Sequence, residues 1–356
     1  MRAAVDYAIE LEKMFLAYRL AQALMPFWVF RGMNANEAVQ QLEKIASVPA
    51  PESLSEERYK ILLHLARFYH YTPHAPKAIP IFEECLAYWR QKEDQKNIGL
   101  VLNDFGFHIM RDGKYEESNV YSLEAKSIFE KLSHKERLVA SINNIGMSYM
   151  WRGRPLEAIP YFRKNLDLTQ ELGDNRRNAQ ALINTAYCNR MMDELELAEE
   201  QLQESLITFQ KGSSRIFEET ALLFISYVYH EYGEYEKCRD LSFEIEQLAK
   251  ETRTVFALGS SLERRAMAEY GLGNLEEAKS NIEKSREILN ISLDSFYDIA
   301  TVSHALITWG MEDYSLFRSI CNDLLSRDLN EGNYTCIIPG LEYSALELSL
   351  IHISEP

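Results

Sequence analysis

Apolar residues recur at helical spacing along almost the whole chain, and polar residues fill the positions between them. The clearest example runs from Asn143 to Asp174, where Ile159, Phe162 and Leu166 mark one face of a helix. A turn signal at Gly153 separates this helix from a preceding segment of the same periodicity. The stretch therefore predicts two antiparallel helices joined by a tight turn.

Small residues mark the place where the two helices of such a pair cross, and they return every forty residues. A glycine, alanine or serine at a crossing lets two helix backbones approach closely. In the first helix of each pair these residues are Ala66, Gly106, Gly146, Ala186, Ser226 and Ala266. In the second helix they are Ala38, Ala78, Ser118, Ala158, Ala198, Cys238 and Ala278. The turn position holds Gly113, Gly153, Asp193, Gly233 and Gly273, and one deleted residue then shifts the register to Ala305 with Phe317.

A fixed period built from helix pairs is typical of a solenoid. The sequence therefore predicts an all-α fold, a right-handed α-α superhelix of about eight helical hairpins with a period of about forty residues. Length alone would suggest two or three domains, but the unbroken period favours one elongated array.

The pattern NxxG…GxYxEA resembles the tetratricopeptide repeat (TPR) family. It lies at Asn103–Gly106 with Gly113–Ser118, and again at Asn143–Gly146 with Gly153–Ala158. The repeats exceed the usual 34-residue unit by about six residues, and most lack the proline that ends the second helix. The resemblance covers nearly the whole chain and implies a fold, but no particular function.

The first repeat carries a narrower resemblance. A helix ending in Phe27, Trp28, Arg31 and Gly32, then a short helix and a Pro/Ala-rich break, resembles the C-terminal TPR region of bacterial STAND-type signal-transduction ATPases. These are the NB-ARC-containing regulators of the LuxR and AfsR type, in which a nucleotide-binding domain precedes the repeats and a DNA-binding domain lies at one end. The sequence holds no G-x-x-x-x-G-K-[ST] phosphate loop and no basic helix-turn-helix. The resemblance therefore implies a sensor module recovered as a fragment.

The pattern predicts four segments. Residues 1–48 are an atypical first hairpin, in which a single helix is expected over residues 1–25, and a proline-containing break at Pro49–Ser53 follows. Residues 55–338 are the TPR-like solenoid, and residues 339–348 begin a truncated further repeat. Residues 349–356 (SLIHISEP) resemble the translated read-through of a sequencing adapter, and the alternative is a short frayed terminus.

Composition narrows the functional classes. The net charge is −16, from 54 acidic and 38 basic residues, which argues against sequence-independent nucleic-acid binding. The five cysteines form no CxxC pair and fall mostly at core positions, as in a reducing compartment. No apolar run reaches about 18 residues, so a membrane span is not expected. These features together predict a cytoplasmic protein.

The sequence offers little catalytic chemistry. His70 and His74 are four residues apart, a spacing that can bind zinc on a helix, but Pro73 interrupts the helix and no HExxH glutamate is present. Carboxylate pairs such as Glu116/Glu117 lie at the solvated start of second helices, where they favour the helix dipole. We therefore expect no catalytic, metal or cofactor-binding residue, and no enzyme activity.

The first helices are expected to line a concave groove that binds a ligand. Neutral amides suit an extended peptide backbone, arginine suits a carboxylate, and tyrosine adds apolar contact. The candidate residues are Asn144, Asn184, Tyr187, Arg190, Tyr227 and Arg264. In the alternative interpretation the asparagines bond across neighbouring repeats and the aromatic side chains simply pack.

The favoured function is a non-catalytic scaffold that binds a protein or peptide, with self-association as a further possibility and no cofactor. By resemblance it is the sensor or oligomerisation arm of a STAND-type transcriptional regulator. One alternative is a stand-alone peptide receptor or adaptor. Another is the substrate-recruiting arm of an enzyme whose catalytic domain lies elsewhere.

Overall fold

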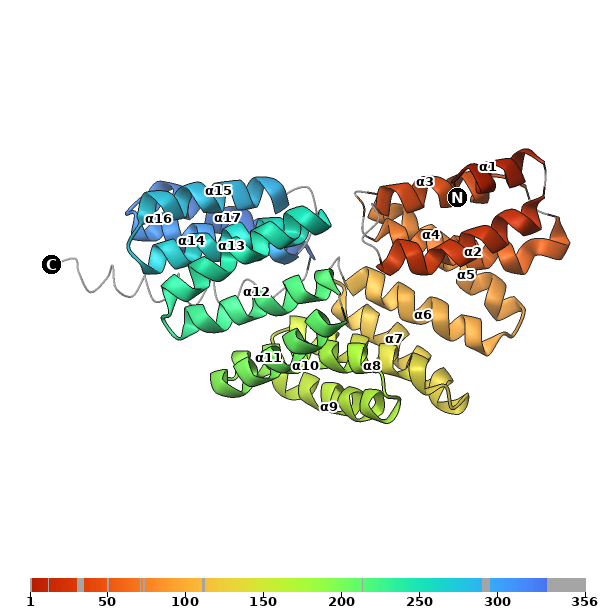
Figure 1. Cartoon of the computed structure of the whole chain (residues 1–356), viewed down its shortest axis with the longest axis horizontal. Helices are drawn as coiled ribbons and strands as arrows, with labels where there is room; N and C mark the ends of the chain where they lie inside the picture. The colour runs from red at the N-terminus through yellow and green to blue at the C-terminus, as the bar shows by residue number, and fades with distance from the viewer. Residues whose placement is uncertain are drawn as a thin grey trace. The chain divides into compact units, whose positions relative to one another are not determined.

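The computed structural model describes residues 2–331 apart from residues 12, 31–34, 50, 71, 73, 111–112, 213 and 290–294. Within these residues the chain is helical and contains no strand (Figure 1). The all-α, repeated hairpin fold predicted from the sequence is confirmed. Arg31, Gly32, Cys336 and the predicted segments 339–348 and 349–356 lie outside the described residues.

The helices follow one another as antiparallel pairs joined by short turns. Their bounds are α1 (Arg2–Glu10), α2 (Met14–Phe30), α3 (Ala35–Ala46), α4 (Ser55–Tyr69), α5 (Ala78–Gln91), α6 (Gln95–Met110), α7 (Tyr115–Lys131), α8 (Lys135–Trp151), α9 (Pro155–Glu171), α10 (Asn175–Met191), α11 (Leu195–Lys211), α12 (Arg215–Glu231), α13 (Tyr235–Thr252), α14 (Val255–Gly271), α15 (Leu275–Leu289), α16 (Ser295–Gly310) and α17 (Tyr314–Glu331). Two short 3₁₀ helices, Glu52–Leu54 and Ala75–Lys77, lead into α4 and α5. From α4 onward the even-numbered helix is the first of each pair.

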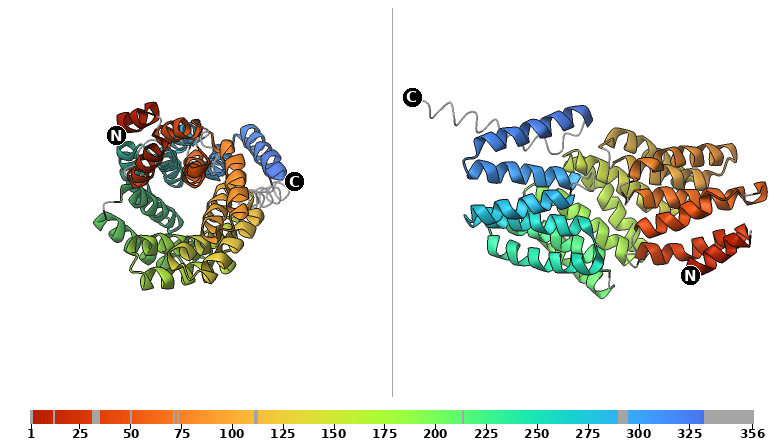
Figure 2. Two further views of the ribbon diagram at one scale, coloured as in Figure 1. Left: turned by 90° about the vertical axis from the view of Figure 1, so that its right-hand side faces the viewer. Right: turned by 90° about the horizontal axis from the view of Figure 1, so that it is seen from above.

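Packing divides the chain into two compact units, a division of which the unbroken sequence period gives no sign. Unit 1 holds residues 1–108 and 120–141, and unit 2 holds residues 109–119 and 142–356. Within unit 2 the first helices α10, α12, α14 and α16 each contact the next one, and the green-to-blue helices follow in that order in Figure 2. The site described below lies along these first helices, which contact one another.

Left-handed backbone positions end the helices with the same forty-residue period. Inside the pairs they are Gly113, Gly153, Asp193, Gly233, Gly273 and Glu312, with φ from 60° to 82°. Between the pairs they are Glu93, Ser133, Gly173 and Arg253, with φ from 52° to 65°. At Gly153 the amide of Arg154 donates to the carbonyl of Tyr149 at 3.0 Å, and the amide of Gly153 donates to that of Met150 at 3.0 Å. This bonding satisfies the last carbonyls of α8 and reverses the chain.

The recurring small residues are buried throughout the array. Gly146 shows why bulk is excluded at one of them, because a Cβ atom built there would lie 2.6 Å from the ring of Phe162 on α9. Ala158 precedes Phe162 by one turn and is fully buried in the same cluster. The small side chain therefore makes room for a facing aromatic ring as well as for the backbone.

The N-terminal segment differs from the single helix expected over residues 1–25. The chain there forms two helices, α1 and α2, which pack against each other. The amide of Lys13 donates to the carbonyl of Ala8 at 2.9 Å and so closes α1. Small buried residues, Ala8 on α1 and Ala17 on α2, allow this close return of the chain. The apolar pattern concealed the break because no glycine or proline marks it.

Candidate functional site

The candidate site lies on the first helices of unit 2, beginning with α8 and α10. On α8 the part-exposed residues include Asn143, Met147 and Trp151, and on α10 they include Asn184 and Tyr187. The amide of Asn184 donates to Oδ1 of Asn143 at 2.9 Å, so the two helices share a polar contact. We call these five residues the first-helix stripe.

Asn144, the neighbour of Asn143 in sequence, is placed differently. Its side chain is only 5% exposed. Asn144 and Asn184 occupy equivalent positions of the forty-residue repeat, but the side chain to which Asn184 donates at 2.9 Å is that of Asn143. The asparagine contact therefore crosses neighbouring repeats, as the alternative interpretation describes, while Asn143 and Asn184 both keep part of their surface exposed.

Aromatic rings extend the stripe toward the C-terminal end of α10. The ring centroids of Trp151 and Tyr187 lie 5.7 Å apart, and those of Tyr187 and Phe224 lie 5.3 Å apart in an edge-on arrangement. Both distances are typical of attractive aromatic pairs. Tyr187 thus bridges α8 and α12, and it places an apolar surface beside the amides.

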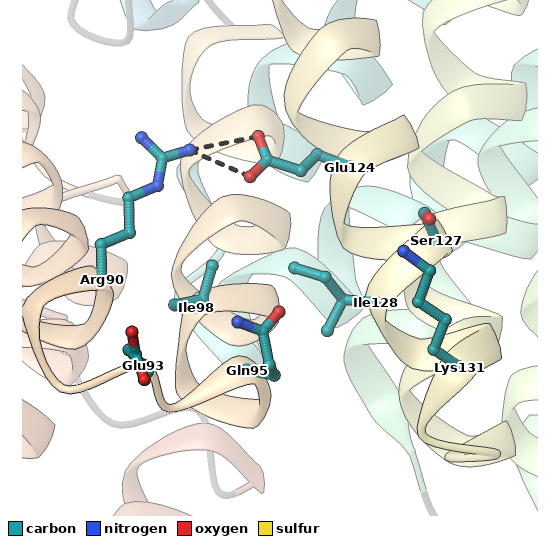
Figure 3. A pocket seen from close by; sticks show the side chains of 8 residues that line it. All are labelled: Arg90, Glu93, Gln95, Ile98, Glu124, Ser127, Ile128 and Lys131. Atoms are coloured by element: carbon teal, nitrogen blue, oxygen red, sulfur yellow. Dashed lines mark hydrogen bonds and ion pairs between the residues drawn. The ribbon is translucent and has the colours of Figure 1, made fainter.

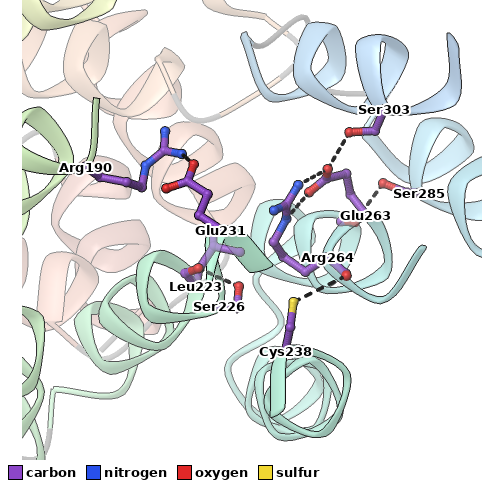
Figure 4. A network of polar contacts seen from close by, with 10 residues as sticks. Arg190, Leu223, Ser226, Glu231, Cys238, Glu263, Arg264, Ser285 and Ser303 are labelled. Atoms are coloured by element: carbon purple, nitrogen blue, oxygen red, sulfur yellow. Dashed lines mark hydrogen bonds and ion pairs between the residues drawn. The ribbon is translucent and has the colours of Figure 1, made fainter. Parts of the chain in front are cut away.

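Arg190 lies between two tyrosine rings. Its guanidinium carbon is 4.8 Å from the ring centroid of Tyr187 and 5.1 Å from that of Tyr227. Its Nη1 forms an ion pair with the carboxylate of Glu231, the last residue of α12 (Figure 4). The cation is therefore held by π-faces and by one carboxylate at the same time.

Arg264 repeats this arrangement on α14 in a more enclosed form. Its guanidinium carbon lies 3.7 Å from the ring centroid of Tyr227. Nε and Nη2 each bind one oxygen of Glu263, and the hydroxyl of Ser303 on α16 donates to Oε1 of the same carboxylate at 2.6 Å (Figure 4). Arg190, Tyr227 and Arg264 form a continuous stack across α10, α12 and α14.

The pKa values reflect this burial. Burial raises the pKa of Tyr227, which stays a neutral phenol. The pKa of Arg264 is raised because the neighbouring carboxylate of Glu263 outweighs the effect of burial. Burial also raises the pKa of Glu231, and the attraction of Arg190 does not fully reverse that effect. His230, beside the stack, has its pKa lowered to about 4 by burial and by Arg264.

Other candidate chemistry gains no support. The part of the chain that the structure describes contains no group of three metal-ligating side chains. The ring of His70 lies 4.8 Å from that of Phe107, while His74 is exposed. Burial raises the pKa of the Cys85 and Cys188 thiols to about 12 and that of Cys238 to about 11, which leaves them poor nucleophiles. None of the described helices combines the length and the hydrophobicity that a membrane span requires.

A shallow cleft of about 330 Å³ lies in unit 1, where α5, α6 and α7 meet (Figure 3). The guanidinium of Arg90 spans it and binds both oxygens of Glu124 at 3.0 and 3.2 Å. Ile98 and Ile128 form its apolar part. Because its central charges neutralise each other, we assign no ligand to this cleft.

The sequence indicated the arginines and tyrosines of the stack but not their carboxylate partners. Glu231 follows Arg190 by 41 residues, and Glu263 directly precedes Arg264. Neighbours in sequence on a helix normally point in different directions, so the second pair gives no sequence signal. Ser303, which lies 40 residues after Glu263, fits the repeat period and was open to prediction from it.

Comparisons with known proteins bear on the fold that carries this site. The tetratricopeptide repeat family model matches residues 137–211. These residues hold nearly all of α8, α9, α10 and α11, and thus the first-helix stripe. No curated protein sequence matches the chain.

Solved structures share the fold at low sequence identity. A Rap protein complexed with Competence and Sporulation Factor matches with a TM-score of 0.64 and 14% identity, over 90% of this chain and 99% of that chain. NprR in complex with its cognate peptide NprX gives 0.60 and 17%, over 86% and 85%. A STAND protein with a tetratricopeptide repeat sensor from Pyrococcus horikoshii gives 0.52 and 15%, over 93% of this chain and 54% of that chain. The chain therefore has the fold of a TPR-like repeat scaffold.

Proposed function

We propose that the first-helix stripe of unit 2 binds an extended peptide or protein segment, and that the chain acts as a non-catalytic scaffold. The observation that carries this proposal is the amide pair Asn143–Asn184, part-exposed beside Met147, Trp151 and Tyr187. An asparagine side chain donates and accepts at once, which matches the alternating groups of a peptide backbone.

The side chains around the amides suit a peptide of mixed polarity. Met147 adapts to differently shaped apolar side chains, and Trp151 and Tyr187 offer rigid aromatic surface. Of the solved structures with this fold, one contains Competence and Sporulation Factor and another a cognate peptide, which supports the class of ligand. Arg190 borders the stripe at Tyr187 and stacks on Tyr227, so both Arg190 and Tyr227 belong to the same proposal. Arg264 is left out of it, because its guanidinium is buried and bound by Glu263.

A peptide pull-down tests the proposal directly. The double variant Asn143→Ala/Asn184→Ala removes both amides, and we expect it to recover at most about one tenth of the peptide that the native chain recovers. The variant Asn144→Ala/Asn184→Ala tests the register taken from the sequence, and a smaller loss is expected because Asn144 is buried. Asn175→Ala, at an exposed position on the same helix, is the matched control. Equal recovery by the Asn143→Ala/Asn184→Ala variant and the control would contradict the proposal.

The biological setting is a further part of the proposal. We favour the sensor or oligomerisation arm of a STAND-type regulator, because a STAND protein with a TPR sensor shares the fold. The alternatives are a stand-alone peptide receptor or adaptor and a recruiting arm of an enzyme. Reading the gene upstream distinguishes them, since a phosphate loop, a catalytic domain or a true start codon each supports a different one.

A further inference from the structure

Two arginines of unit 2 stack on the same tyrosine but hold their carboxylates differently. Arg264 uses Nε and Nη2 to bind both oxygens of Glu263, and the two side chains are 5% and 2% exposed. Arg190 binds Glu231 through Nη1, and its Nε is buried with no hydrogen-bond partner among the described residues. The side chains of this second pair are 16% and 35% exposed. The pair Arg264–Glu263 is thus buried and uses both Nε and Nη2 of its guanidinium. The pair Arg190–Glu231 is partly exposed and uses only Nη1.

Glu231 is placed so that it can leave Arg190 without disturbing the fold. It is the last residue of α12, so rotation of its own side chain is enough. Its side chain is already 35% exposed, so it can turn further into solvent, where hydration offsets part of the lost attraction to Arg190.

Arg190 stays in position when Glu231 leaves. The rings of Tyr187 and Tyr227 lie on it at 4.8 and 5.1 Å from their centroids. These rings limit the rotamers of the guanidinium and so reduce the entropy that a ligand must overcome. Once Glu231 has left Nη1, the two Nη groups present the planar fork that binds a carboxylate through two hydrogen bonds.

We propose that Arg190 binds a carboxylate of the bound peptide, and that Glu231 competes with the peptide for Arg190 and is displaced by it. This inference rests on the peptide-binding function proposed above and names its ligand class, a peptide carrying a carboxylate next to an apolar segment. Tyr187 joins Arg190 to Trp151 and the amides, so the carboxylate binds at Arg190 while the apolar segment lies along the first-helix stripe. Arg264 takes no part, because Glu263 already uses its fork.

The experiment measures the affinity of fluorescent short peptides, selected on the native chain from a random library, by anisotropy. Each peptide is made in three forms: with a free C-terminus and no acidic residue, with an amidated C-terminus and no acidic residue, and amidated with one glutamate. The forms separate a terminal carboxylate from a side-chain carboxylate. The variants are Glu231→Gln and Arg190→Gln. Arg154→Gln and Glu157→Gln, from an exposed ion pair elsewhere in unit 2, are matched controls.

We expect Glu231→Gln to bind carboxylate-bearing peptides about fivefold more tightly, because the competitor is gone. Arg190→Gln is expected to bind them at least about tenfold more weakly and to lose the difference between free and amidated forms. The two controls are expected to stay within about twofold of the native chain. A merely structural ion pair predicts the opposite for Glu231→Gln, namely unchanged or weaker binding, and that result would overturn the inference.

The failure of this inference is distinguishable from failure of the proposed function. In one outcome, peptides bind the native chain and lose affinity in Asn143→Ala/Asn184→Ala, but bind the Arg190 and Glu231 variants as tightly as the native chain. That outcome supports peptide binding by the first-helix stripe and rejects the role of Arg190. A native chain that retains no peptide rejects both. If Arg190→Gln does not fold, as judged by circular dichroism, Glu231→Gln alone decides the question, since its exposed side chain is not part of the core.

Discussion

The region from α8 to α11 and the region from α12 to α15 share one repeat period, yet their first helices differ in how much of their surface is exposed. On α10 a stripe that includes Asn184 and Tyr187 stays part-exposed, and the buried side is mostly small and apolar, as at Ala179 and Ala186. On α14 every residue from Gly259 to Glu269 is buried, including four charged ones. The period therefore fixes where backbones cross, but it does not decide what covers a first helix.

The difference has an energetic consequence. A part-exposed stripe leaves polar groups in contact with water, so they can exchange their partners for a ligand. A first helix enclosed on all sides must satisfy its charges internally, as Glu263 does with Arg264 and Ser303. We therefore expect binding to depend on the α8–α11 region and stability to depend strongly on the polar contacts of the α12–α15 region.

The largest expected effect is at Arg264. Replacement by methionine keeps much of the volume but leaves Glu263 buried without its cation, and we expect a loss of about 3–5 kcal/mol in the free energy of unfolding. The double variant Glu263→Met/Arg264→Met should recover most of that loss. Urea unfolding measures both. Arg190→Met is the comparison, and if it destabilises the chain as much as Arg264→Met does, the contrast between the open and enclosed pairs is wrong.

The next largest effect is expected where α8 and α9 pack tightly, in the region from α8 to α11. Gly146→Leu forces a side chain into space held by the ring of Phe162, since even its Cβ atom would lie 2.6 Å from that ring. We expect a loss of about 3 kcal/mol, near the upper end for overpacked cores. Gly212→Ala is the control, because the nearest atom to a Cβ there is a carbonyl oxygen at 3.4 Å. An unchanged thermal midpoint for Gly146→Leu would contradict the crossing assigned to this position.

Acid should weaken the region around α15 and α16 through the buried side chain of His304. Burial and the charge of Arg286 lower the pKa of His304 to about 4, and its Nδ1 lies 2.7 Å from Nη1 of Arg286. Between the ordinary pKa near 6.5 and about 4, the unfolded chain binds a proton that the folded chain does not. Stability therefore falls as the pH drops through that range, by up to about 3 kcal/mol for this residue.

The variant His304→Gln isolates this contribution, because glutamine keeps an acceptor for Arg286 but does not titrate. His230, whose pKa is lowered to about 4, is present in both proteins, so its contribution cancels. Chemical unfolding at pH 7 and pH 4.5 should show a smaller loss for His304→Gln than for the native chain. Parallel pH profiles would mean that His304 is protonated in the folded state.

The sequence carries information on where small side chains recur at the helix crossings, but little on what surrounds the first helices. Gly146 and Ala158 could be assigned because steric exclusion at a crossing repeats with the backbone. The left-handed turn at Arg253 could not, since arginine gives no signal for that conformation. Whether Asn184 pairs with Asn143 or with Asn144 depends on the rotation of one helix relative to its neighbour. The residue types do not encode that rotation. The pairing of Arg190 with Glu231 depends on it too.

The smallest expected effect concerns one position of the forty-residue repeat on the first helices. Ala179 and Gly259 occupy it in two repeats, and in the repeat between them a glutamate, Glu219, is buried there. The residue thirty positions later is Phe209 after Ala179 and Leu289 after Gly259, but only Ala249 after Glu219. Glu219 therefore supplies volume that the second helix lacks. Its Oε1 accepts from the hydroxyl of Thr252, whereas its Oε2 has no partner among the described residues.

Glu219→Met keeps the volume and removes the carboxylate. We expect a gain of about 1 kcal/mol at pH 7, because burial raises the pKa of Glu219 and so disfavours its charged form. The hydroxyl of Thr252, released from Glu219, can donate to the carbonyl of Leu248 at 3.1 Å instead. The sign follows from linkage, since the folded chain holds this proton more tightly than the unfolded chain does, and the penalty is therefore absent below about pH 4.5. Glu219→Ala, which removes the charge and the volume together, should instead be neutral or destabilising. Guanidinium unfolding at pH 7 and pH 4 measures all three proteins, and a gain for Glu219→Met that persists unchanged at pH 4 would show that the buried charge is not its cause.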